Sequence, residues 1–115
     1  MRTAKLKGGL DVERDRKRLA LVRDVLAEAC DGARPGLMLD ANEAWNRKQA
    51  VRHIRELEQS FDLIWVEEPV RRWDAEGLAS VGRGVKASIA TGENLTGLEQ
   101  FRPLLAACPA GEVFT

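Results

Sequence analysis

The sequence predicts an α/β fold built on a parallel sheet, and three observations lead to this prediction. Short apolar segments alternate with longer segments of helical periodicity along the 115 residues. The central apolar segment, Leu63–Val66, has no polar alternation, which is typical of a strand covered on both faces. Three of the apolar segments lead to an acid, Asp40, Glu67 or Glu93, and these acids stand 27 and 26 residues apart. Each interval fits one strand and one helix.

Composition limits the class of protein. The 18 basic and 18 acidic residues balance and are mixed along the predicted helices, so no nucleic-acid surface is expected. No apolar stretch approaches the roughly 20 residues that cross a bilayer, and Met1–Lys5 has no signal-peptide character. Cys30 and Cys108 are isolated, which indicates free thiols and a cytoplasmic location.

The first unit begins with a predicted strand at Thr3–Lys7, which the pair Gly8–Gly9 ends. Asp11 is expected to cap a long helix that reaches about Cys30. Most of the charged run Glu13–Arg18 in its first turns is interpreted as a solvated face without a functional role.

The second unit has its strand at Gly36–Asp40 and a connecting loop at Ala41–Trp45. Asn46 is expected to cap a helix that reaches about Ser60. His53 is the single histidine of the chain, and its place in the middle of this helix predicts a surface residue without a catalytic role.

The third strand is expected to end at Glu67 and Glu68, because acids do not belong in a two-sided apolar core. Pro69 lacks a backbone donor and helps to stop the strand. Asp74 then caps a short helix that is predicted to end near Val81.

The fourth strand is predicted within Ala87–Gly92. Thr96–Glu99 has capping-box spacing and should start a helix to about Ala107, which Pro103 would bend or split. Val113–Phe114 resembles the start of a further strand.

Three consecutive parallel strands therefore present Asp40, Glu67 and Glu93 at one edge of the sheet. Neighbouring strands lie about 4.8 Å apart, so the three carboxylates can converge on one ion. Carboxylates held this close repel one another unless a cation offsets their charge. A hard divalent cation with oxygen ligands fits best, and Mg²⁺ is preferred because it keeps positions open for water or substrate.

Lys5 and Lys7 lie on one face of the first strand. A lysine acts as a base only when its pKa falls from about 10.4 toward neutrality, and a second ammonium nearby disfavours protonation of the first. A metal that binds a substrate carboxylate stabilises the enediolate formed when the adjacent C–H loses its proton. The set of residues therefore indicates proton abstraction α to a carboxylate.

Four sequence motifs resemble the enolase superfamily, and specifically its mandelate racemase-like subgroup. The motifs are Lys5–Lys7, Leu39–Asn42, Trp65–Pro69 and Thr91–Asn94. The resemblance extends from about Thr3 to Ala107.

This resemblance implies a TIM-type (β/α)8 barrel with Mg²⁺ held by Asp40, Glu67 and Glu93. It assigns Lys7 as a general base and Lys5 as its electrostatic partner, and it places Asn42 near a small carboxylate substrate. In full-length relatives it implies homo-oligomers.

Family members are several times longer than this chain. Residues 1–115 resemble about the second to fifth barrel units, with a potential beginning of the sixth. The capping domain, the remaining units and the second acid/base, a His-Asp dyad, would lie outside the chain. We therefore expect a fragment of the catalytic barrel that is weak or inactive in isolation.

The favoured activity is dehydration of an acid sugar. A racemase or epimerase of a 2-hydroxy acid uses the same proton abstraction and stays an alternative, as does a non-catalytic remnant. A receiver-type signalling module is the least favoured, because it needs acids after its first strand and a lysine after its last.

Overall fold

The computed structural model describes residues 2–32, 34–108 and 113–114. Within these residues, five strands alternate with four helices. The strands are β1 Thr3–Lys7, β2 Gly36–Asp40, β3 Leu63–Glu67, β4 Ser88–Ala90 and β5 Val113–Phe114. The helices are α1 Val12–Ala29, α2 Arg47–Glu58, α3 Ala75–Gly84 and α4 Gly97–Ala107. The strands form one sheet in chain order, and every neighbouring pair is parallel, which confirms the α/β prediction.

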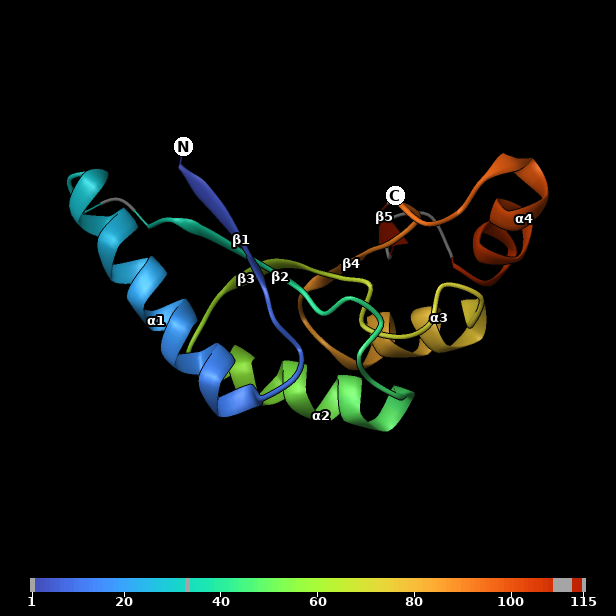
Figure 1. Ribbon diagram of the computed structural model, residues 1–115, viewed down its shortest axis with the longest axis horizontal. Helices are drawn as coiled ribbons and strands as arrows, with labels where there is room; N and C mark the ends of the chain where they lie inside the picture. The colour runs from blue at the N-terminus through green and yellow to red at the C-terminus, as the bar shows by residue number, and fades with distance from the viewer. Residues whose placement is uncertain (1, 33, 109–112, 115) are drawn as a thin grey trace.

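The helices follow one another along one side of the curved sheet, as Figure 1 shows from α1 in blue to α4 in orange. Each helix contacts the next one in the chain. No described helix is both long and apolar enough to cross a membrane.

The hydrophobic core lies between the sheet and this layer of helices. Apolar residues from the strands face the helices, and buried helix residues meet them there. The strand contribution consists of Leu37, Leu39, Leu63, Val66 and Ile89, and the helix contribution includes Leu19, Ile54, Leu57, Leu78, Val81 and Leu104. This core fixes the strands, and with them the positions of the residues at the strand ends.

The opposite face of the sheet is open at β3, which corrects one expectation. Ile64 in the middle of β3 is 39% exposed, although the strand was expected to be buried on both faces. The parallel register shifts between Leu37 and Met38, where β2 pairs with β3. Among the described elements none covers Ile64, so this apolar side chain meets solvent.

Three predicted N-caps are confirmed. The side chains of Asp11, Asn46 and Asp74 each accept a hydrogen bond from a backbone N–H in the first turn of α1, α2 and α3. Each cap satisfies a donor that the helix itself leaves unpaired. Cys30 and Cys108 are the C-cap residues of α1 and α4, and Cys30 is a free thiol.

The capping box predicted at Thr96 is wrong. The Thr96 side chain makes no capping hydrogen bond, and the side chain of Gln100 accepts the Thr96 N–H at 2.8 Å instead. The helix continues through Pro103 as a single element and is not split.

The third helix is longer than predicted, because α3 continues past Val81 to Gly84. A Cβ at Gly84 would lie 3.1 Å from Cγ2 of Val51 on α2. The glycine therefore reflects close packing of two helices and does not break the helix. The apolar residues of α1 are only partly buried, since Leu21 and Val25 are 65% and 56% exposed.

Candidate metal centre

The carboxyl ends of β1, β2 and β3 lie side by side at one edge of the sheet. The register pairs Lys7 with Asp40, and Asp40 with Glu67. The ladder continues one residue further, because Gly8 N–H donates to the Asp40 carbonyl and Ala41 N–H donates to the Glu67 carbonyl, both at 2.9 Å. The backbone that carries these side chains is therefore held by the sheet itself.

The structure brings three carboxylates together at this edge. Asp40, Glu67 and Glu93 each offer one oxygen, and the three oxygens lie within 4.8 Å of one another. Asp40 is buried, Glu67 is half-buried and Glu93 is exposed. The cluster is therefore buried at Asp40 and open to solvent at Glu93.

The hydrogen bonding of Asp40 fits a cation at this cluster. One oxygen, Oδ1, accepts the backbone N–H of Asn42 at 3.0 Å. The other, Oδ2, is buried and accepts no hydrogen bond from any described residue. The ammonium groups of Lys5 and Lys7 stand 3.5 and 3.8 Å from Oδ2. A buried oxygen without a donor is costly, and oxygen-only donors suit a hard divalent cation.

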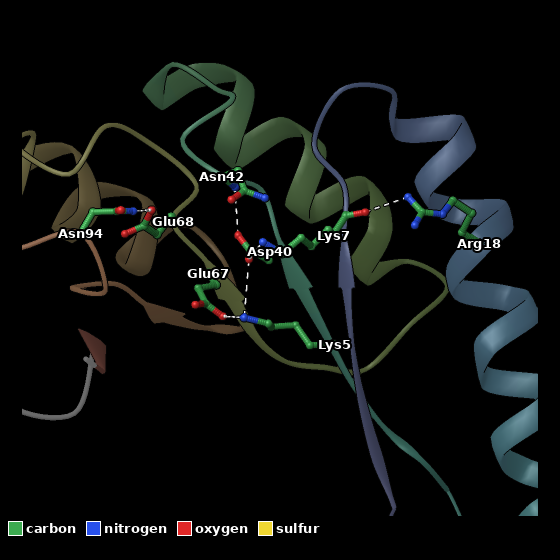
Figure 2. A network of polar contacts seen from close by, with 8 residues as sticks. All are labelled: Lys5, Lys7, Arg18, Asp40, Asn42, Glu67, Glu68 and Asn94. Carbon is green, nitrogen blue, oxygen red and sulfur yellow. Dashed lines mark hydrogen bonds and ion pairs between the residues drawn. The ribbon is translucent and has the colours of Figure 1, made fainter.

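Lys5 reaches into the cluster from β1, as Figure 2 shows. Its Nζ lies 2.6 Å from Oε2 of Glu67. This hydrogen bond raises the pKa of Lys5 above its ordinary value, and it outweighs burial, which acts in the opposite direction. Lys5 is therefore held as an ammonium ion, the form expected of an electrostatic partner.

Lys7 is the more exposed of the two lysines, with 71% of its side chain accessible. Its backbone carbonyl accepts a hydrogen bond from Nη1 of Arg18 on α1 at 2.7 Å (Figure 2). The backbone of Lys7 is thus fixed, while its amine stays accessible at the edge of the sheet.

Three non-glycine residues at this edge adopt the left-handed backbone region. Asn42 and Glu43 follow β2 with φ angles of 48° and 61°, and Glu68 follows β3 with φ 44°. Such conformations cost about 1 kcal/mol or more per residue and persist where the surrounding structure imposes them. They turn the chain directly after the strands, so that Asn42 lies beside Asp40.

A second row of polar residues, Glu43, Glu68 and Arg72, lies in the loops after β2 and β3, and the sequence pattern indicated no role for these side chains. Nε and Nη2 of Arg72 donate to the two oxygens of Glu43 at 2.8 and 2.9 Å, and the Arg72 backbone N–H donates at 2.7 Å. The hydrogen bonds from Arg72 hold the pKa of Glu43 below its ordinary value. The pair ties the loop after β2 to the loop after β3.

Glu68 belongs to the same row and is 1% exposed. Its Oε2 accepts a hydrogen bond from Nδ2 of Asn94 at 2.8 Å (Figure 2). Burial raises the pKa of Glu68, and the Asn94 hydrogen bond opposes that rise. The prediction that Glu68 lies at the strand end is confirmed, but its contact with Asn94 was not foreseen.

Asp15 on α1 is a buried exception in the charged run, most of which was expected to be solvated. This residue is 2% exposed, and its Oδ2 accepts the Gly9 backbone N–H at 2.7 Å. A Cβ at Gly8 would lie 2.4 Å from Oδ1 of Asp15. The glycine pair thus lets the chain approach a buried carboxylate, which holds the turn after Lys7.

His53 lies outside the cluster, as expected, but it is only partly exposed. Its ring packs edge-on against Trp45, with ring centroids 5.3 Å apart and planes at 79°. Nε1 of Trp45 donates to the Gly9 carbonyl at 2.6 Å. The histidine therefore supports the packing of the loop after β2 on the turn after β1.

A cavity of about 770 Å³ opens beside the carboxylates on the uncovered face of the sheet. Glu67 and Glu93 lie at its polar end, and Ile64, Trp65 and Phe101 supply apolar wall. The volume is in the range of small-molecule sites.

Comparison with known proteins identifies the family. The model of the enolase C-terminal domain-like family matches residues 1–111. L-talarate/galactarate dehydratase from Salmonella typhimurium is 41% identical over 91 residues, which make up 79% of this chain and 21% of that enzyme. Hydrophobic dipeptide epimerase from Enterococcus faecalis is 37% identical over 92 residues, 80% of this chain and 24% of that enzyme. The chain thus spans about a fifth to a quarter of the length of these relatives.

Solved structures agree with this result. The crystal structure of L-talarate dehydratase from Polaromonas sp. JS666, complexed with magnesium and L-glucarate, superposes with a TM-score of 0.79 at 38% identity. The match covers 91% of this chain and 28% of that one. The expected partial (β/α)8 barrel is confirmed, because the consecutive parallel βα units superpose on part of a TIM-barrel enzyme. The chain therefore belongs to the enolase C-terminal domain-like family.

Proposed function

We propose that this chain carries the magnesium-binding part of an enzyme that removes the proton α to a carboxylate. The observation that carries the proposal is the cluster of three carboxylates within 4.8 Å of one another, with the ammonium of Lys5 hydrogen-bonded to one of them. Three acids that can bind a metal ion and a nearby pair of amines at the ends of parallel strands are the groups that this reaction class requires.

In this proposal Asp40, Glu67 and Glu93 hold the Mg²⁺. When bound, the cation supplies positive charge that offsets the charge developing on a substrate carboxylate. Lys7 takes the α-proton, which its exposed amine is free to approach. The ammonium of Lys5 adds positive charge beside the same carboxylate.

Asn42 contributes to substrate binding in the proposal. Its side chain is exposed, while its backbone N–H is committed to Asp40. The amide of the side chain is therefore available to a hydroxyl or carboxylate of a bound acid.

Dehydration of an acid sugar is the favoured outcome, and its support is the 41% identity to a talarate/galactarate dehydratase. Racemisation or epimerisation is the second candidate, supported by the 37% identity to a dipeptide epimerase. Both outcomes begin with the same proton transfer and differ in the acid that acts next. Membership of the family argues against a receiver module.

The domain assignment is part of the proposal. Residues 1–115 would be a fragment of the catalytic barrel, covering about strands 2 to 5 and a potential start of strand 6, with the capping domain and the other units outside it. The isolated chain would then turn over substrate weakly or not at all, and a non-catalytic remnant stays an alternative. The cytoplasmic location and the homo-oligomeric state of a full-length protein also remain predictions.

The metal site is tested by isothermal titration of the chain with MgCl2. We expect one site per chain, and an affinity at least about tenfold lower in Glu67→Gln, because a ligand charge is removed. Glu99→Gln is the matched control, since Glu99 is exposed on α4. Equal affinity of the wild-type chain and Glu67→Gln would refute the site.

The reaction is tested in a longer protein that supplies the remaining barrel units. Incubation with galactarate in D2O should release a keto acid or exchange the α-proton, as followed by proton NMR. Both signals should require Mg²⁺ and disappear in Lys7→Met. Turnover that persists without metal, or at an unchanged rate in Lys7→Met, would contradict the proposal.

A further inference from the structure

Glu68 and Asn94 immediately follow two of the clustered carboxylates, Glu67 and Glu93. Their side chains are joined by the 2.8 Å hydrogen bond from Asn94 Nδ2 to Glu68 Oε2. Glu68 is a buried acid, and its second oxygen has no hydrogen-bond partner among the described residues. Because buried polar groups are normally hydrogen-bonded, the single side-chain hydrogen bond of this carboxylate is important for its environment.

Glu93 is the carboxylate of the cluster with the least direct support. Asp40 is buried and accepts a backbone N–H, and Glu67 is bonded to Lys5. Glu93 is exposed, and within the described part of the chain no hydrogen bond or ion pair holds its carboxylate. Its position near the other two oxygens must therefore come from the loop that carries it.

Glu68 holds that loop on both sides of Glu93. Before it, the backbone N–H of Glu68 donates to the Ala90 carbonyl at 2.8 Å. After it, the Glu68 carboxylate accepts the side chain of Asn94. Between these two points the loop turns at Gly92, with φ 118°, and closes with a 3.0 Å hydrogen bond from Leu95 N–H to the Gly92 carbonyl.

The conformation of Glu68 suits this double attachment. Its φ of 44° turns the chain directly after β3, so Glu67 and Glu68 do not continue the alternation of the strand. The side chain of Glu67 meets Lys5 while that of Glu68 meets Asn94, as Figure 2 shows. Left-handed backbone in a non-glycine residue is unfavourable, and here it directs two adjacent acids to two different partners.

We propose that Glu68 is a positioning residue: through its hydrogen bond to Asn94 it orders residues 91–95 and so holds Glu93 within reach of the metal. This inference rests on the proposed function, because it assigns Glu93 to the metal site. Substitution of a residue that orients a metal ligand without touching the metal typically lowers metal affinity about 10- to 100-fold.

The test is the substitution Asn94→Ala, which removes the donor at an exposed position and leaves the core intact. Titration with MgCl2 should show about tenfold weaker binding, whereas the metal-free midpoint of thermal unfolding should not change. A merely structural role would lower the midpoint as well. Thr96→Ala is the matched control, since its side chain lies in the same loop and makes no capping bond.

A double-mutant cycle with Glu68→Leu identifies the partner. If the hydrogen bond carries the effect, Asn94→Ala should weaken Mg²⁺ binding no further in the Glu68→Leu background. If Glu68→Leu does not fold, the Mg²⁺ affinities of Asn94→Ala and Thr96→Ala still test whether the Asn94 side chain supports metal binding. Unchanged affinity in Asn94→Ala, or additive losses in the cycle, would overturn the inference and leave the metal site standing.

A metal-free measurement separates this inference from the proposed function. Hydrogen exchange at the Leu95 amide should be about tenfold faster in Asn94→Ala than in the wild-type chain, because the loop opens more often. Absence of Mg²⁺ binding by the wild-type chain would refute the proposed function. Unchanged exchange at Leu95 would refute the ordering role of Glu68 alone.

Discussion

Asp40→Asn should leave the stability of the metal-free chain almost unchanged and should remove most of the stabilisation that Mg²⁺ adds. In the metal-free chain Asp40 faces two carboxylates within 4.8 Å, and each repels it by about 3.5 kcal/mol at an effective dielectric of 20. It also faces two ammonium groups at 3.5 and 3.8 Å, each attracting it by about 4 to 5 kcal/mol on the same scale. The attraction therefore exceeds the repulsion by only about 2 kcal/mol on this scale.

Both the attraction and the repulsion are weaker than these figures. The side chains of Lys5 and Lys7 are 35% and 71% exposed, Glu93 is exposed as well, and water screens these charges. Asp40→Asn should therefore leave the metal-free midpoint of thermal unfolding within a few degrees of the wild-type value. The substituted asparagine has nearly the same size and shape as Asp40, and its amide oxygen can still accept the hydrogen bond from the Asn42 N–H.

With magnesium the two chains should differ. Free Mg²⁺ at 100 times its dissociation constant adds about 2.7 kcal/mol to the free energy of unfolding, which raises the midpoint by about 10 °C in a domain of this size. Loss of a direct ligand that weakens binding more than 100-fold reduces the shift to under about 2 °C.

The assay is differential scanning calorimetry in EDTA and in MgCl2. Asp62→Asn provides the matched control, since it makes the same change at an exposed residue before β3 and should keep the full magnesium shift. Equal shifts in the wild-type chain and Asp40→Asn would refute the reasoning.

Three further outcomes are expected. Arg72 lowers the pKa of Glu43 from its ordinary 4.5, so the pair stabilises the folded chain above pH 4.5. This stabilisation is lost as the pH falls through the pKa of Glu43 in the folded chain. In Glu43→Gln the midpoint of thermal unfolding should therefore decrease less steeply as the pH is lowered. Ile54→Ala, at a fully buried site, should cost about 2 to 5 kcal/mol in urea unfolding, whereas a small loss would contradict the described core. Asp15→Ala leaves the Gly9 N–H without its acceptor and should cost about 1 to 3 kcal/mol; unchanged urea midpoints would refute that contact.

The convergence of the carboxylates could be predicted because it follows from topology. Parallel strands in chain order end at one edge, so acids placed after three successive strands must meet there. Asp40 and Glu67 follow this rule directly, since they are paired in the register. Glu93 lies three residues beyond β4, and its position depends on a loop that strand periodicity does not describe.

What could not be predicted depends on tertiary contacts. Asp15 looked like one charge in a solvated run, but the glycine turn after β1 brings a backbone donor onto it. The third helix was predicted to end near Val81, but it continues to Gly84, where α3 packs closely on α2. Glu68 follows Glu67 directly in the sequence, and neither its left-handed backbone nor its hydrogen bond with Asn94 could be inferred from that position.

The same reasoning explains the open face of β3. An unbroken apolar strand indicated cover on both sides, and the cover on the side of Ile64 does not come from any described element. The unbroken apolar pattern therefore overstated the burial of this strand, in which Leu63 and Val66 are buried and Ile64 is exposed.

The most direct test of the metal site is a crystal structure of the chain soaked with MnCl2, with data collected for anomalous scattering. The account predicts one strong peak within about 2.5 Å of an oxygen from each of Asp40, Glu67 and Glu93, at distances that oxygen ligands allow. A peak elsewhere, or well-ordered carboxylates with no peak between them, would contradict it.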